Sequence, residues 1–296
     1  MDRPLRIGTR GSPLALAQAH MVANALRAHH GWPEEAVEIV PITTSGDRIQ
    51  DRPLAEVGGK ALWTKELDRC LLDGRTDLSV HSMKDVETVR PEMLTIPAML
   101  PRADPRDRLV GADSVAALPH GARVGTSSPR RSAQLLARRP DLRIVTMRGN
   151  VQTRLAKLER GEADATLLAA AGLERVGLSE VGTVLDDMIP APSQGAIGIE
   201  VLAQAEGISK LVRPIDHAQT HRCIDAERAF LAAVGGDCRS AVAAHARCIG
   251  GGIRLRAEIL LPDGSEVRGG EGEDPAALAR KLLSDASPGL RALFAG

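Results

Sequence analysis

Short apolar runs alternate along this chain with longer segments of helical pattern, which is typical of an α/β protein. The run Leu78–Val80 predicts a short buried strand, and the polar residues 81–85 come directly after it. Further strands are predicted at 142–147 and 196–200. Since open α/β sheets bind ligands beyond the carboxyl ends of their strands, residues 81–85 are a candidate site. A surface loop with a Lys-Asp ion pair is the alternative.

One arrangement occurs twice. A strand ends in Gly-Thr, a serine follows, and a proline opens a helical segment, predicted at 14–28 in one copy and at 130–139 in the other. Ser12 and Ser128 thus hold N-cap positions. Such helix starts present free N–H groups and the positive end of the helix dipole, so they suit anions. A capped helix without a ligand is the alternative for either copy.

A second arrangement also repeats: a helix closed by Gly74 or Gly161, then an aspartate that leads into an apolar strand. This repetition predicts two similar α/β lobes. Proline-containing segments at 97–105 and 189–195 predict the crossings between them. We expect lobe 1 to comprise residues 1–98 and 196–217, and lobe 2 to comprise residues 99–195.

The pattern of apolar and polar residues changes from about residue 220. A helix is predicted at 225–234, strands at 241–248 and 253–260, and a last helix at 276–285. Residues 218–296 therefore predict a small α+β domain. The expected fold class is α/β, with two lobes and this smaller C-terminal domain.

The composition narrows the possible functions. Of 296 residues, 1% are aromatic, which argues against a surface that stacks nucleic-acid bases. Lys and Arg number 38, as do Asp and Glu, so net charge favours neither DNA nor an anionic membrane. No apolar run approaches the ~20 residues of a membrane span, and no secretion signal is visible. We expect a cytoplasmic protein whose four cysteines are reduced thiols.

Basic residues gather at the predicted junctions between loops and helices. Arg148 and Arg154 flank a Gly turn that opens a helix, and arginine matches carboxylate or phosphate in two-pronged contacts. The pattern indicates a cleft that binds a polyanion, with solvated helix faces as the alternative. The basic residues concerned are Arg10, Lys60, Lys84, Arg130, Arg131, Arg148, Arg154 and Arg175.

Several other sites are not supported. Residues 58–60 lack the spacing of a nucleotide-binding P-loop, and no strand leads into a Gly-rich dinucleotide motif. His217, His221 and Cys223 suggest a metal, but no further ligand stands at a convincing spacing, so no metal is expected. Cys238 lies in a Gly-rich loop beside an arginine, where it is either a nucleophile or an inert thiol.

Taken in order, these motifs resemble the porphobilinogen deaminase (hydroxymethylbilane synthase) family. The resemblance runs from about Leu5 into the C-terminal domain, and the ordered set is far more specific than any one motif. The matching segments are residues 9–16, 57–60, 81–85, 104–107, 125–131, 148–151, 171–173, 194–196 and 227–229.

The resemblance implies two lobes like those of periplasmic solute-binding proteins, with a third domain that carries the cofactor on a loop. It implies a transferase that joins four porphobilinogen molecules head to tail with loss of ammonia and releases hydroxymethylbilane with water. The cofactor would be a dipyrromethane held by a thioether to Cys238. The family also suggests a monomer. A non-catalytic bilobal binding protein for a small polycarboxylate is the alternative.

The resemblance also implies roles for individual residues. Asp85 matches the catalytic aspartate, which would stabilise positive charge on a pyrrole ring. The residues expected to bind the cofactor, besides Cys238, are Lys60, Ser82, Lys84, Thr126, Ser127, Arg130 and Arg131. Those expected to bind substrate are Arg10, Ser12, Arg148, Arg154, Arg175 and Gln194.

A few positions depart from the commonest family pattern. Glu87 replaces a frequent proline shortly after Asp85. None of the departures removes a residue assigned to chemistry. The other departures are Glu56, Ser193, Asp237 and Ala241.

Overall fold

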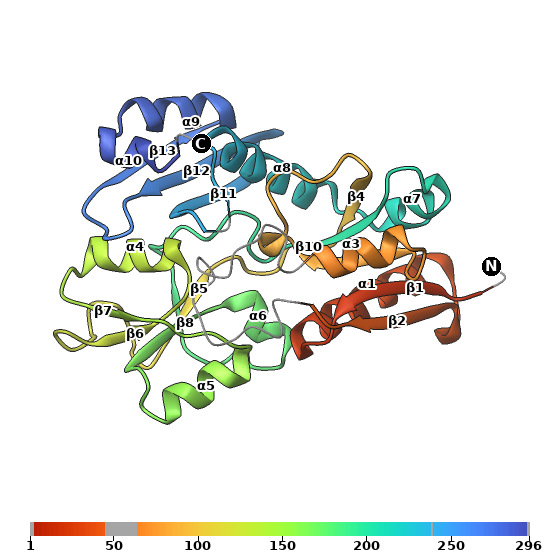
Figure 1. Ribbon diagram of the computed structural model, residues 1–296, viewed down its shortest axis with the longest axis horizontal. Coiled ribbons are helices and arrows are strands. Elements are labelled where there is room, and N and C mark those ends of the chain that lie inside the picture. Colours follow the sequence, from red (N-terminus) through yellow and green to blue (C-terminus); the bar gives the residue numbers. More distant parts are fainter. Residues whose placement is uncertain (1–2, 45–63, 238, 295–296) are drawn as a thin grey trace. The chain divides into compact units, whose positions relative to one another are not determined.

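The computed structural model of this chain describes residues 3–44, 64–237 and 239–294 (Figure 1). The described residues fall into two compact units. Unit 1 comprises residues 3–44, 64–103 and 196–221; unit 2 comprises the remainder. Within the described residues, the chain passes between units after residues 103, 195 and 221. The division into three domains stays a prediction.

Unit 1 contains a mixed five-stranded sheet of order β2-β1-β3-β10-β4. The first three strands are parallel, and β10 runs antiparallel to both of its neighbours. Ile7, Val80 and Ile199 lie in its buried core. The strands are β1 (Leu5–Arg10), β2 (Val37–Ile42), β3 (Leu78–Ser82), β4 (Leu94–Met99) and β10 (Ile197–Leu202).

Helix α1 begins as the sequence predicts. The Oγ atom of Ser12 accepts a hydrogen bond from the backbone N–H of Ala15 at 3.3 Å, and Gly31 ends the helix with a φ of 65°. Apolar residues of α1, including Val22 and Leu26, pack into the core of the sheet. The helices of unit 1 are α1 (Pro13–His30), α3 (Lys65–Leu72) and α7 (Glu206–Val212), with 3₁₀ turns η1 (Glu34–Ala36), η2 (Met83–Asp85) and η3 (Arg213–Ile215).

Unit 2 contains a second mixed sheet of order β7-β6-β8-β5-β9. As in unit 1, three parallel strands are followed by an antiparallel one, here β5, which confirms the expected similarity of plan. Its elements are β5 (Asp107–Val110), β6 (Arg123–Gly125), α4 (Pro129–Arg138), β7 (Arg143–Val145), α5 (Val151–Glu159), β8 (Ala165–Ala169), α6 (Ala170–Arg175) and β9 (Thr183–Leu185).

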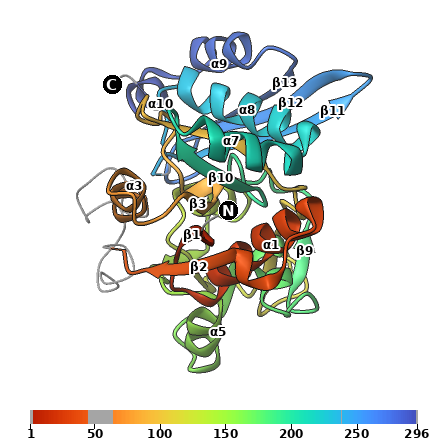
Figure 2. The same ribbon diagram turned by 90° about the vertical axis from the view of Figure 1, so that its right-hand side faces the viewer.

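The end of the chain adds a three-stranded antiparallel sheet (Figure 2), of which the sequence predicted the first two strands. Phe230 of α8 and Leu278 of α9 share one core with the apolar face of this sheet. Ala133 of α4 packs with Ala241 and Leu260 in a smaller cluster. The elements are α8 (Ala218–Ala233), β11 (Val242–Ile249), β12 (Gly252–Leu260), β13 (Val267–Gly272), α9 (Pro275–Ser284) and α10 (Pro288–Ala292).

The main differences from the sequence prediction concern β3, α8 and β13. Strand β3 extends to Ser82 rather than ending at Val80, because His81 and Ser82 pair with Gly198 and Ile197 of β10. Helix α8 starts well before residue 225. Strand β13 was not predicted, since its sequence VRGGEG carries one apolar residue and three glycines. None of the helices within the described ranges is long and apolar enough to cross a membrane.

Candidate active site

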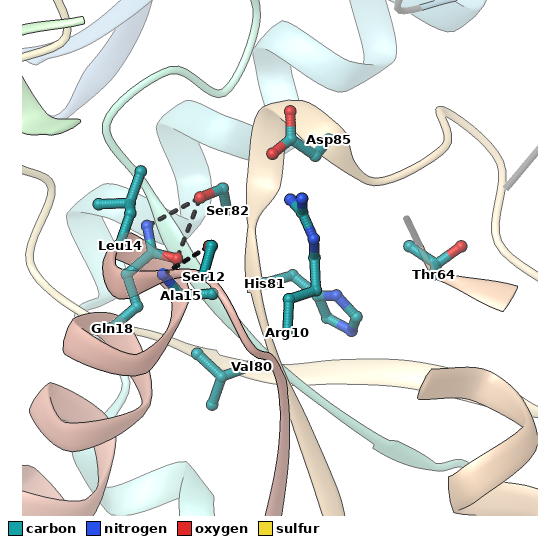
Figure 3. Close-up of a pocket in the computed structure, with 10 residues that line it drawn as sticks. All are labelled: Arg10, Ser12, Leu14, Ala15, Gln18, Thr64, Val80, His81, Ser82 and Asp85. Carbon is teal, nitrogen blue, oxygen red and sulfur yellow. Dashed lines mark hydrogen bonds between the residues drawn. The ribbon is translucent and has the colours of Figure 1, made fainter. Parts of the chain in front are cut away.

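A pocket in unit 1 opens where β1 and β3 end and α1 begins (Figure 3). This is the edge of the sheet at which the sequence predicts a site, and Gln18 and Thr64, two polar residues that the sequence did not assign to the site, line it as well. The lining residues are Arg10, Ser12, Leu14, Ala15, Gln18, Thr64, Val80, His81, Ser82 and Asp85.

Asp85 is the last residue of turn η2 and is half-buried. Its carboxylate and the guanidinium of Arg10 point toward the same space in Figure 3. Asp85 makes no hydrogen bond or ion pair with any residue of the described ranges. Its neighbours Met83 and Val86 are 0% and 5% exposed. The backbone around it therefore sets where the carboxylate lies.

His81 lines the pocket and makes a buried hydrogen bond to Glu200. Its Nε2 lies 3.0 Å from the Oε2 of Glu200, and the Glu200 side chain is fully buried. Burial is the largest single influence on the pKa of Glu200 and would raise it, but the hydrogen bonds and charges of His81 and Arg90 outweigh it and lower that pKa to about 2. An ionised carboxylate only accepts hydrogen bonds, so Nε2 carries the proton that binds it.

Gln18 and Ser82 form the other buried contact in the pocket. The Gln18 Nε2 donates to the Ser82 Oγ at 2.8 Å, and that Oγ lies 3.0 Å from the Gln18 Oε1. Sequence reasoning assigned Ser82 to the site but missed Gln18. The available signal was an amide side chain on the apolar face of α1, next to the buried Ala15 and Ala19.

Unit 2 has a capped helix start at the end of β6. The Ser128 Oγ accepts from the backbone N–H of Arg131 at 3.4 Å, and the Thr126 Oγ1 accepts from that of Ser128 at 3.1 Å. The Ser127 hydroxyl donates to the Met147 carbonyl at 3.0 Å. The predicted N-cap at Ser128 is confirmed, and the three polar side chains order the loop that opens α4.

Arg130 and Arg131 are 3% and 5% exposed and share one partner, Asp107 of β5. Arg130 pairs with one Asp107 oxygen, and the Nη2 of Arg131 lies 2.7 Å from the other. Burial would raise the pKa of Asp107, but the two guanidiniums outweigh it and hold that pKa well below its usual range. The Nε atoms of both arginines are buried without a partner in the described part of the chain.

Gln194 belongs to the same cluster. Its Nε2 donates to the Pro105 carbonyl at 2.7 Å and to the Asp107 Oδ1 at 2.8 Å, and the residue is 1% exposed. The side-chain amide is therefore engaged inside unit 2. Its predicted contact with substrate stays a prediction.

The other arginines predicted for the site lie in or beside the short helices α5 and α6 of unit 2. Arg148 follows β7 and is 8% exposed. The Nε of Arg154 donates to the Gly149 carbonyl at 2.9 Å, across the start of α5. The Nη2 of Arg175 donates to the Gly195 carbonyl at 2.6 Å, and burial lowers the pKa of Arg175 to about 10.

The structure brings predicted residues together in the unit 1 pocket and around Asp107 in unit 2. Arg10, Ser12, Ser82 and Asp85 line the unit 1 pocket, and Lys84 adjoins it in sequence. Lys60 and Cys238 lie outside the described residues. Within the described ranges, no three His, Cys, Asp or Glu side chains are grouped so as to hold a metal ion. Arg130, Arg131 and Gln194 meet at Asp107. The predicted residues that lie in unit 2 are Thr126, Ser127, Arg130, Arg131, Arg148, Arg154, Arg175 and Gln194.

Comparison with known proteins identifies the family. Residues 5–210 match the family model described as "Porphobilinogen deaminase, dipyromethane cofactor binding domain", and residues 221–286 match "Porphobilinogen deaminase, C-terminal domain". The porphobilinogen deaminase of Sphingopyxis alaskensis is 58% identical over 99% of this chain and 98% of its own length. That of Paracoccus denitrificans is 50% identical over 98% of this chain and 94% of its own length.

Solved structures with a related arrangement include a periplasmic binding protein of an arginine transport system from Legionella pneumophila. It is 16% identical, covers 72% of this chain and 92% of its own, and has a TM-score of 0.42. The family models and the two relatives decide in favour of an enzyme over a binding module. This chain belongs to the porphobilinogen deaminase (hydroxymethylbilane synthase) family, the dipyrromethane-dependent transferases of tetrapyrrole biosynthesis.

Proposed function

We propose that Asp85 is the catalytic group of this porphobilinogen deaminase. Loss of ammonia from porphobilinogen leaves positive charge on the pyrrole ring, and a carboxylate near the ring nitrogen stabilises that charge. At ~4 Å and an effective dielectric constant near 20, such a pair is worth about 4 kcal/mol. The observation that carries the proposal is the half-buried Asp85 carboxylate in the unit 1 pocket, without any partner among the described residues.

Arg10 and Ser12 bind carboxylates of the substrate in the same pocket. Porphobilinogen carries an acetate and a propionate, and a guanidinium matches either one in a two-pronged contact. The N-terminus of α1, capped by Ser12, adds backbone N–H groups and the positive end of the helix dipole. The Arg10 guanidinium, which shares the pocket with Asp85, also offsets the negative charge that accumulates there.

The donor chemistry of unit 2 fits a dipyrromethane with its four carboxylates. The helix starts at α4 and α5 supply N–H groups, and the buried Nε atoms of Arg130, Arg131 and Arg175 lack partners in the described ranges. When bound, the dipyrromethane supplies the primer on which the product chain grows. In unit 2, the residues that would hold it are Thr126, Ser127, Arg130 and Arg131, and those that would hold substrate are Arg148, Arg154, Arg175 and Gln194. The family match also assigns Lys60 to the cofactor, together with Ser82 and Lys84 of unit 1.

Cys238 anchors the cofactor through a thioether, by the family motif that it matches. We infer further that the enzyme is a cytoplasmic monomer with porphobilinogen as its substrate and no metal, nucleic-acid or membrane partner. Residues 1–98 with 196–217, 99–195 and 218–296 are its three domains.

The role of Asp85 is tested with Asp85→Asn, which keeps shape and removes charge. Turnover per cofactor-loaded molecule should fall by about a thousandfold, the equivalent of about 4 kcal/mol. Asp73→Asn, at an exposed ion pair of α3, is the matched control and should keep wild-type turnover. Wild-type activity in Asp85→Asn would remove Asp85 from this role.

Intact mass tests the anchor. The wild-type protein should carry a covalent excess of two pyrrole units, and Cys238→Ser should carry none. A stable adduct on Cys70, Cys223 or Cys248 would contradict the assignment.

A further inference from the structure

The chain that leaves turn η2 is fastened to the rest of unit 1 by the guanidinium of Arg90. Its Nε and Nη2 donate to the two carboxylate oxygens of Glu200 on β10, at 2.8 and 2.9 Å. Its Nη2 also donates to Asp68 of α3 at 2.6 Å, and its Nη1 to Glu87 at 2.5 Å. The Arg90 side chain is 9% exposed. One buried cation therefore joins a strand, a helix and the segment just after the candidate catalytic residue.

The charges in this cluster make Arg90 necessary to it. Three carboxylates from three segments face one guanidinium, and His81 also contacts Glu200. Burial raises the pKa of Asp68, Arg90 opposes that rise, and the nearby Glu200 adds to it. Without Arg90, Asp68, Glu87 and Glu200 would repel one another in a setting that water reaches poorly.

Asp85 lies between two anchors. Before Asp85 in the sequence, His81 pairs with Gly198 of β10. After it, Arg90 forms an ion pair with Glu200 of the same strand. The Asp85 side chain has no hydrogen bond of its own within the described ranges, so these anchors determine where its carboxylate lies.

Glu87 adds a further contact to this cluster. It stands where the commonest family pattern has proline, a residue that stiffens the backbone by fixing φ near about −65°. Here Glu87 instead pairs with Arg90, and its carboxylate accepts from the Thr64 Oγ1 at 2.9 Å. At position 87, side-chain contacts thus hold the backbone that a proline ring would otherwise stiffen.

We propose that Arg90 is a positioning residue that holds turn η2, and with it the Asp85 carboxylate, at the pocket. The proposal rests on the role of Asp85 proposed above. Arg90 does not line the pocket, so it acts on the reaction through the turn and not by contact with substrate. Only a planar guanidinium with several donors satisfies Glu200, Asp68 and Glu87 together; the single ammonium of lysine would satisfy part of this set.

Steady-state kinetics of the cofactor-loaded protein test the proposal. Arg90→Leu should lower kcat by about 10- to 100-fold, the scale of a roughly 1 Å misplacement, and leave KM within about twofold. Arg90→Lys should recover part of that loss. The control is Arg6→Leu, which breaks an ion pair with Asp77 elsewhere in unit 1 and should leave kcat unchanged.

The pair Arg90→Leu and Asp85→Asn separates the two proposals. If Arg90 acts through Asp85, adding Arg90→Leu to Asp85→Asn should cause no further loss of kcat. Amide hydrogen exchange gives a readout independent of activity: residues 83–87 should exchange faster in Arg90→Leu than in wild type or Arg6→Leu.

The outcomes are distinct. Full activity in Asp85→Asn would refute the role of Asp85, whatever Arg90 does. A kcat in Arg90→Leu equal to that of Arg6→Leu, or additive losses in the double variant, would refute positioning by Arg90 while leaving Asp85 in place. Unchanged exchange at residues 83–87 would refute it as well. If Arg90→Leu does not fold, Arg90→Lys carries the same comparisons.

Discussion

Met83 occupies the space that a side chain at position 198 would need. A Cβ atom built on Gly198 would lie 2.1 Å from the Met83 Sδ, and Met83 is 0% exposed. The two residues lie on the turn that carries Asp85 and on strand β10, which pairs with β3. The absence of a side chain at Gly198 therefore lets the turn lie close against the sheet.

Gly198→Ala should move this turn. The added methyl group forces Met83 outward at a cost of about 1–3 kcal/mol in the free energy of unfolding, and turnover should fall with it. Urea unfolding and kcat are the measurements. Gly207→Ala, in α7 with nothing near its Cβ position, should leave both unchanged or slightly raise stability. Adding Met83→Ala should restore part of the activity lost in Gly198→Ala; no recovery would contradict this packing argument.

The Asp107 cluster yields a second prediction. Asp107→Asn leaves the buried guanidiniums of Arg130 and Arg131 side by side without their counter-ion, which should cost about 3–5 kcal/mol of unfolding free energy. Asp187→Asn breaks the ion pair between Arg138 and Asp187, whose side chain is 63% exposed. This variant should lose less than about 1 kcal/mol of unfolding free energy. Equal losses in the two variants would show that burial of the Asp107 cluster does not matter.

Local signals were sufficient for much of this fold. The Ser-Pro pairs at 12–13 and 128–129 predicted helix starts because capping depends on residues three or four positions apart. The strand β3 was predicted from its apolar run, and its polar continuation marked the site. The extension to Ser82 was missed because it depends on pairing with β10, more than a hundred positions along the chain.

The partners of the predicted arginines could not be found in this way. Asp107 meets Arg131 because β5 runs antiparallel beside β8 in unit 2, a relation that no local pattern contains. Likewise Arg90 reaches Glu200 across 110 positions of sequence. Sequence gives the charges and their density, whereas the fold decides which carboxylate each guanidinium meets.

The cap of α5 yields a third prediction. The Asn150 Oδ1 accepts from the backbone N–H of Thr153 at 2.8 Å, so Asn150→Ala should cost about 1 kcal/mol of unfolding free energy. Asn150→Gly should cost only a few tenths, since glycine is tolerated at an N-cap. If Asn150→Ala and Asn150→Gly lost equal unfolding free energy in thermal or urea unfolding, the hydrogen bond would not be the source of stability. If the start of α5 also binds carboxylates, KM for porphobilinogen should rise in the Ala variant.

Glu200 makes stability depend on pH in a definite direction. Its pKa is lowered to about 2 in the folded protein, against about 4.3 for a free glutamate, so the folded state favours the ionised form. The stabilisation, about 3 kcal/mol, is complete above the unfolded pKa and is lost as pH falls from about 4.5 toward 2. The glutamine in Glu200→Gln cannot ionise, so this variant lacks the stabilisation. The gap in unfolding free energy between wild type and Glu200→Gln should therefore be constant from pH 7 to about 5.5 and narrow at pH 4 and 3, as measured by urea unfolding. A gap that widens in acid would mean that Glu200 is protonated in the folded state, and that the contacts with Arg90 and His81 do not hold its charge.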